Sequence, residues 1–258
     1  MARRRTVDLN ADVGEATEED DIAREHALIA LVTSVNVACG GHAGDEASMS
    51  ATVAAALEAH VRIGAPPSYP DRAGFGRRPM TMSREELRTS IGDQLRALGR
   101  VCDAAGSSVE SVKPHGALYE EVAKGGVAYE AMRDAVRDTY GPDTALVLPS
   151  ACRAMAMALR DVVPTREEGF CDRAYRPDCG LVDRATPGAV LEDPAEAAAQ
   201  ALSLARGAVV ASNGCVLTLW VDTLCIHGDS PGAVAIAQAV RDALTDAGIA
   251  ISAPAPRP

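Results

Sequence analysis

The stretch at residues 6–15 constrains the fold most, because its polar residues fall at every second position. Alternate side chains of a β-strand point to opposite sides, so Asp8, Asn10 and Asp12 share one face of a predicted strand. Two neighbouring carboxylates are costly to bury unless a metal, a cation, a shared proton or water lies beside them. The stretch therefore predicts a strand that ends in a polar site, with Glu15 as a third acid just beyond it.

Polar clusters also occur where four other predicted strands give way to a helix or a loop. They cover residues 34–45, 69–78, 112–119 and 221–229. Open α/β sheets and α/β barrels both gather their sites at the carboxyl ends of parallel strands. The clusters therefore predict one shared site at that end of the fold.

Apolar, β-branched runs alternate with helical patterns, which is typical of a mainly parallel sheet, open or closed into a barrel. A capping-box pattern at Ser83 and Glu86, and Pro194 after Asp193, mark two helix starts. Strands are expected near residues 6–10, 33–38, 61–65, 110–113, 144–148 and 221–227, and helices over 18–31, 46–60, 83–105, 128–139, 150–160, 193–206 and 231–247.

Two segments interrupt this alternation. Asn213 and Gly214 stand between two apolar runs in residues 208–220, which predicts a hairpin. Residues 169–192 are rich in Asp, Arg, Gly and Pro, and we expect a long functional loop there.

The chain has 258 residues and no linker-like segment, so we expect a single α/β domain over residues 1–252 and a disordered tail at 253–258. Its formal charge of −11 argues against a nucleic acid or an anionic membrane as partner. The basic residues 1–5 are not followed by an apolar stretch of signal-peptide length, and no segment is apolar enough to span a membrane. A soluble, cytoplasmic protein is the expectation.

The seven cysteines are an odd number and include no C-x-x-C pair. This pattern argues against a disulfide framework and against a zinc knuckle. We expect most of them to be reduced, buried and small apolar residues.

Seven motifs in the same order, covering nearly the whole chain, resemble the LamB/YcsF family. They are Asp8-Leu-Asn-Ala-Asp-Val-Gly-Glu15, Asn36-Val-Ala-Cys-Gly-Gly-His-Ala-Gly-Asp45, Gly74-Phe-Gly-Arg77, Val112-Lys-Pro-His-Gly-Ala-Leu-Tyr119, Asp172-Arg-Ala-Tyr175, Pro187-Gly-Ala189 and His227-Gly-Asp229. The resemblance implies an irregular seven-stranded α/β barrel similar to the glycoside hydrolase and deacetylase superfamily.

The resemblance also implies an activity, the ATP-dependent opening of 5-oxoproline to L-glutamate by a multi-subunit 5-oxoprolinase. This chain would be the lactam-hydrolysing component, the A subunit, and partner subunits B and C would handle ATP. The sequence agrees, since it has no G-x-x-x-x-G-K-[ST] loop and Gly74-Phe-Gly76 is too short for a nucleotide fingerprint. One position departs from the family: Pro66 stands where relatives usually have a His, so any contact made by that His is missing here.

The expected chemistry needs a base, an acid and an anion site. Asp12 or Asp8 would take a proton from water, and His115 would protonate the departing nitrogen. Lys113 would hold the substrate carboxylate or a phosphate, with Arg77 and Arg78 as alternative anchors. The substrate-binding expectation covers Asn10, Glu15, Asn36, His42, Asp45, Arg77, Lys113, Tyr119, Arg173, His227 and Asp229.

Structural roles remain open for most of these residues. Asp8 and Asp12 can be hydrogen-bonded caps at the barrel mouth, and His42 can cap the helix that follows it. His115 and His227, each before a Gly, can be satisfied buried residues. Cys39 can be a nucleophile but is better explained as a packed small residue. The pair Asp172 and Arg173, together with Arg184, can form a substrate lid or a solvated, salt-bridged loop. His26 and His60 are expected outside the site.

Two other functions compete with metal-free lactam hydrolysis. The first is a zinc- or manganese-dependent amide or acetyl hydrolase, for which Asp8, Asp12, His42, His115 and His227 offer suitable ligand types. No H-x-x-x-H or H-E-x-x-H spacing supports it, so no bound metal is expected. The second is a non-catalytic subunit that binds substrate or docks onto the subunits that use ATP.

Overall fold

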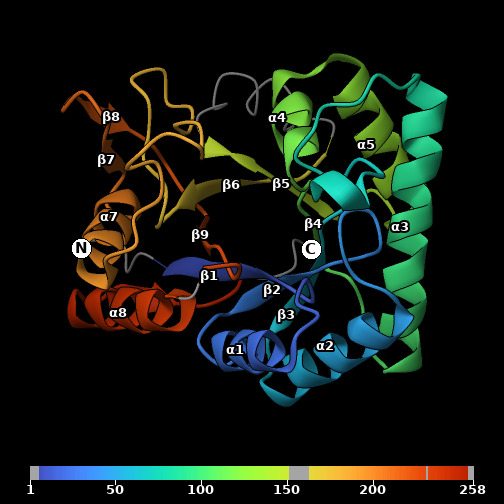
Figure 1. Ribbon diagram of the computed structural model, residues 1–258, viewed down its shortest axis with the longest axis horizontal. Helices are drawn as coiled ribbons and strands as arrows, with labels where there is room; N and C mark the ends of the chain where they lie inside the picture. The colour runs from blue at the N-terminus through green and yellow to red at the C-terminus, as the bar shows by residue number, and fades with distance from the viewer. Residues whose placement is uncertain (1–5, 151–162, 231, 255–258) are drawn as a thin grey trace.

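The computed structural model describes residues 6–150, 163–230 and 232–254. Its centre is a closed ring of parallel strands, surrounded by helices (Figure 1). The ring closes because β1 pairs with β2 on one side and with β9 on the other. The seven strands of the barrel are, in order around it, β1 (Thr6–Val13), β2 (Ser34–Val37), β3 (Arg62–Ala65), β4 (Ser111–Val112), β5 (Ala145–Pro149), β6 (Thr165–Phe170) and β9 (Thr223–Ile226). The expected seven-stranded α/β barrel is confirmed.

Helices follow most of the strands and pack around the barrel (Figure 1). The predicted capping box is present at the start of α3, where Ser83 and Glu86 bond reciprocally, and Asp193 caps α7 with Pro194 at its first position. The helices are α1 (Glu19–Ile29), α2 (Glu46–Glu58), α3 (Arg84–Ala104), α4 (Ala117–Lys124), α5 (Gly126–Tyr140), α7 (Pro194–Ala205) and α8 (Ala233–Asp246), with a 3-10 turn η1 (Arg72–Gly74).

The sequence expectations missed three elements. Strand β6 carries Arg166, Glu167 and Glu168 instead of an apolar run, so nothing marked it as a strand, and the loop expected at 169–192 begins only after Phe170. Helix α4 is only eight residues long and lies between the strand expected at 110–113 and the helix expected at 128–139, where no helix was expected. Strand β10 (Ala250–Ile251) extends the sheet beside the start of β1.

Two other expectations concern 208–220 and 150–160. The hairpin is confirmed: β7 (Ala208–Val210) pairs antiparallel with β8 (Val216–Thr218). Its connection is longer than a two-residue Asn-Gly turn. The helix expected at 150–160 lies almost entirely outside the described residues, as does most of the tail at 253–258.

The apolar core fills the space between the barrel and its helices. Val7, Leu9, Ala11 and Val13 of β1 face outward into this core, and all are buried. The alternate residues of β1 face the barrel interior, where they meet polar partners from other strands. This register places the polar side chains of β1 in a line that runs up the barrel axis to its carboxyl end.

No helix among residues 6–150, 163–230 and 232–254 is long and apolar enough to cross a membrane. The six cysteines within these ranges are all free, and four of them are buried. The expectation of reduced, mostly buried cysteines is confirmed for that part of the chain.

Candidate functional site

The lowest layer of the barrel interior is built around Asp8. Its carboxylate accepts hydrogen bonds from the hydroxyls of Thr33, Ser34 and Thr223 at 2.7, 2.7 and 2.6 Å. Both oxygens are thereby occupied, and the residue is buried. Of the two roles left open for Asp8, these contacts favour the structural one.

The next layer joins two asparagines to Asp12. The Asn36 side chain donates to Oδ1 of Asn10 at 3.0 Å and to Oδ1 of Asp12 at 2.8 Å. Asn10 in turn donates to Thr223 at 2.7 Å and to Glu168 at 3.0 Å. Each amide therefore ties one strand to its neighbours, and these contacts hold Asp12 in one orientation.

A buried cation occupies the middle of the barrel. The Lys113 ammonium lies 3.0 Å from Oδ1 of Asp12, 3.0 Å from Oε1 of Glu168 and 3.1 Å from the sulfur of Cys225. Tyr119 donates its hydroxyl proton to the other oxygen of Glu168 at 2.7 Å. The partners of the ammonium are therefore groups of the protein, where an anion of the substrate was expected. Tyr119 is likewise paired with Glu168.

Glu15 lies above this network because a side chain from α1 fixes the turn after β1. Glu25 accepts the backbone N–H groups of Gly14, Glu15 and Ala16 at 2.9 to 3.1 Å. Gly14 has a φ of +75°, a conformation that favours glycine at this turn. The turn therefore returns the Glu15 carboxylate over the barrel mouth.

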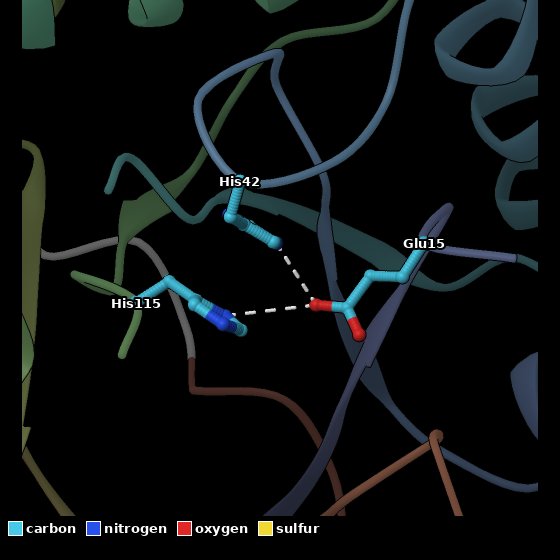
Figure 2. A group of neighbouring side chains, drawn as sticks. All are labelled: Glu15, His42 and His115. Carbon is cyan, nitrogen blue, oxygen red and sulfur yellow. Dashed lines mark hydrogen bonds and ion pairs between the residues drawn. The ribbon is translucent and has the colours of Figure 1, made fainter. Parts of the chain in front are cut away.

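Two stacked imidazoles face that carboxylate (Figure 2). The rings of His42 and His115 lie parallel within 7°, with their centroids 3.6 Å apart. Nε2 of His42 lies 3.0 Å from Oε1 of Glu15, and Nδ1 of His115 lies 3.6 Å from the same oxygen. Nδ1 of His115 is also 3.9 Å from Oδ2 of Asp12. Two nitrogens thus converge on carboxylate oxygens at the carboxyl ends of the strands.

An aromatic ring closes one side of the histidine pair. Phe75 contacts His42 and His115 edge-on, with ring centroids 5.2 and 5.5 Å away. The loop that carries Phe75 can approach residue 116 closely because that residue is a glycine. A Cβ at Gly116 would lie only 2.4 Å from the carbonyl oxygen of Gly76. The Gly-rich motifs therefore bring the two loops together.

Burial and neighbouring charges shift the pKa values in this cluster. Burial alone would raise the pKa of Asp12, but Lys113 and His115 outweigh it and hold that pKa well below its usual range. Burial raises the pKa of Glu15. Burial, followed by the neighbouring His42, lowers the pKa of His115 to about 3. This lowered pKa disfavours the protonated form of His115, so it does not support the expected role of His115 as the acid.

His227 has the opposite character. Its Nδ1 lies 2.9 Å from Oδ1 of Asp172, and its backbone N–H donates to the same carboxylate. Burial would lower the pKa of His227, but Asp172 outweighs it and raises that pKa. Phe170 stacks on the imidazole at 5.6 Å. Asp172 is buried and positions His227, so it is not part of a solvated, salt-bridged loop.

Charged residues at the rim complete the site. Asp229 accepts Arg77 at 2.8 Å and Arg184 at 2.7 Å. Arg77 also lies over the Phe75 ring, 4.8 Å from its centroid. Arg78 instead pairs with Asp71. Arg77 and Arg184 are therefore the cations at the mouth.

Other predicted residues have structural roles. Asp45 is exposed and caps α2, so the capping role considered for His42 belongs to Asp45. Arg173 donates to the carbonyls of Ala189 and Val182 and braces the 171–192 segment. Burial raises the pKa of Cys39 to about 12, which supports a packed residue over a nucleophile. His26 and His60 are exposed outside the site, as expected.

Pro66 lies next to the site. It is buried between Ala65 and Pro67, whose carbonyls accept the backbone N–H groups of Lys113 and His115, each at 2.9 Å. A side chain at position 66 therefore adjoins the main chain that carries two residues of the cluster.

The sequence reasoning missed Glu168 and Glu25. Glu168 was overlooked because its strand was not recognised, although an acid one residue before Gly169 and Phe170 is a polar strand end like the others. The sequence pattern of the first helix places Glu25 on a polar face, and no local signal reveals that its side chain reaches the turn after β1. Long-range pairing of this kind is not encoded at fixed spacing.

The fold belongs to a wider class of barrel proteins. A family 4 acetyl xylan esterase from Clostridium thermocellum, in complex with a cobalt ion, matches 95% of this chain and 85% of its own with a TM-score of 0.51 and 13% identity. At that identity the likeness shows the fold alone. The class is thus the α/β barrel, here with a polar cluster at the carboxyl ends of the strands.

Within this class, the chain belongs to the LamB/YcsF family, whose model matches residues 7–257. It is similar to the A subunit of 5-oxoprolinase from Methylococcus capsulatus, with 44% identity over 96% of each chain, and to the protein of the same name from Mycolicibacterium paratuberculosis, with 45% identity over 96% of this chain and 98% of the relative. The crystal structure of a lactam utilization protein from Thermus thermophilus superimposes with a TM-score of 0.86 and 37% identity, covering 96% of this chain and 99% of that one.

Proposed function

We propose that this chain opens the lactam ring of 5-oxoproline to give L-glutamate, as the lactam-hydrolysing subunit of an ATP-dependent 5-oxoprolinase. The names of its relatives support use of 5-oxoproline and the presence of further subunits. Partner subunits B and C would use the ATP. The observation that carries the proposal is Asp12, a buried carboxylate fixed by Lys113 and Asn36 at the mouth of the barrel.

The reaction defines what the site must supply. A lactam is a poor electrophile, and transfer of the γ-phosphoryl group of ATP to its oxygen activates the ring carbon. Water adds to that carbon and the carbon–nitrogen bond breaks, which leaves an acyl phosphate. A second water then hydrolyses the acyl phosphate to the new carboxylate and inorganic phosphate. The site must take a proton from water, give one to the nitrogen, and hold the substrate's existing carboxylate.

Asp12 is the group that receives the water proton. Lys113 and Asn36 contact its Oδ1, while its Oδ2 faces His115 at 3.9 Å, outside the enclosed network. Its low pKa keeps the carboxylate ionised but makes it a weak base. A weak base suits a substrate that phosphorylation has already activated, so the proposed use of ATP and the environment of Asp12 are consistent.

His227 is the group that protonates the nitrogen. Asp172 lies 2.9 Å from its ring and raises its pKa against the effect of burial, whereas the pKa of His115 is lowered, so His227 is the better proton donor of the two. Arg77, free to exchange its rim contact with Asp229, anchors the substrate carboxylate.

Reconstitution tests the proposal. The chain is combined with its partner subunits B and C, 5-oxoproline and ATP, and glutamate is measured while each component is omitted in turn. We expect glutamate only from the full mixture. His227→Gln should lower the rate by about 10²–10⁴-fold, as expected for loss of a general acid, while the exposed His26→Gln control keeps full rate. Equal glutamate without this chain, or none from the full mixture, would contradict the proposal.

A further inference from the structure

The Glu15–His42–His115 cluster takes no part in the proton transfers proposed above. Its three donor atoms, Oε1 of Glu15, Nε2 of His42 and Nδ1 of His115, all lie within 4.8 Å of one another. Each comes from a different strand end: the turn after β1, the loop after β2, and the residues after β4 (Figure 2). The convergence of two imidazoles and a carboxylate from separate elements calls for its own explanation.

We propose that Glu15, His42 and His115 bind one divalent transition-metal ion of the zinc type. One carboxylate and two imidazoles form a donor set that suits zinc, cobalt or manganese, whereas magnesium and calcium prefer oxygen ligands alone. Tetrahedral ligands about 2.0–2.2 Å from an ion are separated by about 3.3–3.5 Å. The distances of 3.0 and 3.6 Å from Oε1 of Glu15 to the two nitrogens bracket that separation.

The contacts around His115 support a cation site at this point. Its Nδ1 faces Oε1 of Glu15 at 3.6 Å and Oδ2 of Asp12 at 3.9 Å, both beyond a good hydrogen bond. Lys113 neutralises Asp12 through the other oxygen, Oδ1. Among the described residues, no lysine or arginine forms an ion pair with Glu15. An ion bound here would give Glu15 the positive partner that Asp12 already has in Lys113.

The parallel stack of the two rings sets a condition. Nitrogen lone pairs in rings 3.6 Å apart run side by side, so the rings must turn apart for both to point at one ion. Phe75 touches both rings edge-on, with centroids at 5.2 and 5.5 Å, so it lies against the rings that must move. We therefore expect metal uptake to break the stack.

Metal titration of the chain alone, without lactam, ATP or partner subunits, tests the site. We expect one Zn²⁺ per chain by calorimetry and by elemental analysis after gel filtration, and a Co²⁺ d–d absorption typical of four or five ligands. The imidazole nitrogens of His42 and His115 should shift in the NMR spectrum on Zn²⁺ binding, and those of His26 and His60 should not.

Variants separate a built site from surface binding. Glu15→Gln keeps the size of the side chain and an acceptor for His42, and it should weaken Zn²⁺ at least about 10-fold, as should His115→Ala. His26→Ala, an exposed control on α1, should bind like the parent chain. The proposal is wrong if the folded parent chain binds no Zn²⁺ stoichiometrically, or if all variants bind equally. Either result leaves the ring-opening proposal untouched, because no substrate is present.

Discussion

The lower and upper halves of the barrel interior contain the same kinds of polar side chain, but these side chains differ in how fully they are hydrogen-bonded. In the lower half, Asp8 accepts three hydroxyl hydrogen bonds of 2.6 to 2.7 Å. In the upper half, Nδ1 of His115 faces Glu15 and Asp12 at 3.6 and 3.9 Å. Saturated polar groups stabilise a structure, whereas groups held near one another without mutual bonds are available to a ligand.

The contrast also explains why two aspartates on one strand differ in role. Asp8 and Asp12 lie on the same face of β1, four residues apart. The hydrogen bonds to Asp8 come from three neutral hydroxyls, while Asp12 lies beside a lysine and a histidine. We infer that the boundary between framework and site falls between them, at the layer of Asn10 and Asn36.

The largest expected effect is on the upper half. Asp12→Asn keeps the side-chain size but removes the charge, and we expect glutamate formation by the reconstituted enzyme to fall about 10²–10⁴-fold. Asp143→Asn, at an exposed loop residue, is the matched control and should keep full activity. A fully active Asp12→Asn enzyme would show that Asp12, like Asp8, has only a structural role.

Removal of the central cation should damage the framework. Lys113→Met leaves the carboxylates of Asp12 and Glu168 buried without their partner, and loss of one member of a buried pair costs about 3–5 kcal/mol of unfolding free energy. Urea denaturation followed by circular dichroism measures this. Lys124→Met, at an exposed lysine on α4, should change little.

The double variant sharpens the same point. Adding Glu168→Gln to Lys113→Met removes one uncompensated charge, so the two losses should be less than additive by about 0.5–3 kcal/mol. Strict additivity would mean that Lys113 and Glu168 do not act as a pair.

A smaller, pH-dependent effect is expected at His227. Because Asp172 raises the pKa of the folded imidazole, the stabilisation is full below the ordinary imidazole pKa and is lost as the pH rises through the raised value. Asp172→Asn should therefore lower the unfolding free energy by about 1–3 kcal/mol at pH 6 and by less at pH 9. An equal loss at both pH values would mean that the ion pair contributes nothing beyond the backbone hydrogen bond.

The smallest effect is expected in the lower half. Thr33→Val removes one donor to Asp8 and the acceptor for the backbone N–H of Leu9, which should cost about 1–3 kcal/mol of stability. Activity at a temperature where the variant is folded should be unchanged. Loss of activity in a folded Thr33→Val enzyme would erase the division between the two halves.

Much of the fold could be predicted from period and position. Alternation at Asp8, Asn10 and Asp12 showed a strand with a polar inner face, and clusters at strand ends correctly located Glu15, His42 and His115 on one end of the barrel. These signals are local, so they survive in a single sequence.

The errors arose where long-range partners decide the outcome. Strand β6 has a polar sequence, and the barrel tolerates its buried Glu168 because Lys113, just after β4, neutralises it. This pairing is visible only in three dimensions. The same holds for Lys113, expected to bind an anion from outside and found bound to anions of the protein itself. The pKa values of His115 and His227 shift in opposite directions because burial and His42 lower one and Asp172 raises the other, and the sequence does not place these partners beside them.

The most direct test compares Asp12→Asn with Thr33→Val in two assays run side by side, glutamate formation by the reconstituted enzyme and urea unfolding. We expect Asp12→Asn to lose glutamate formation while still assembling with its partners, and Thr33→Val to lose stability while keeping its rate. The reverse pattern, an active Asp12→Asn enzyme beside a folded but inactive Thr33→Val enzyme, would contradict a framework below and a reaction site above.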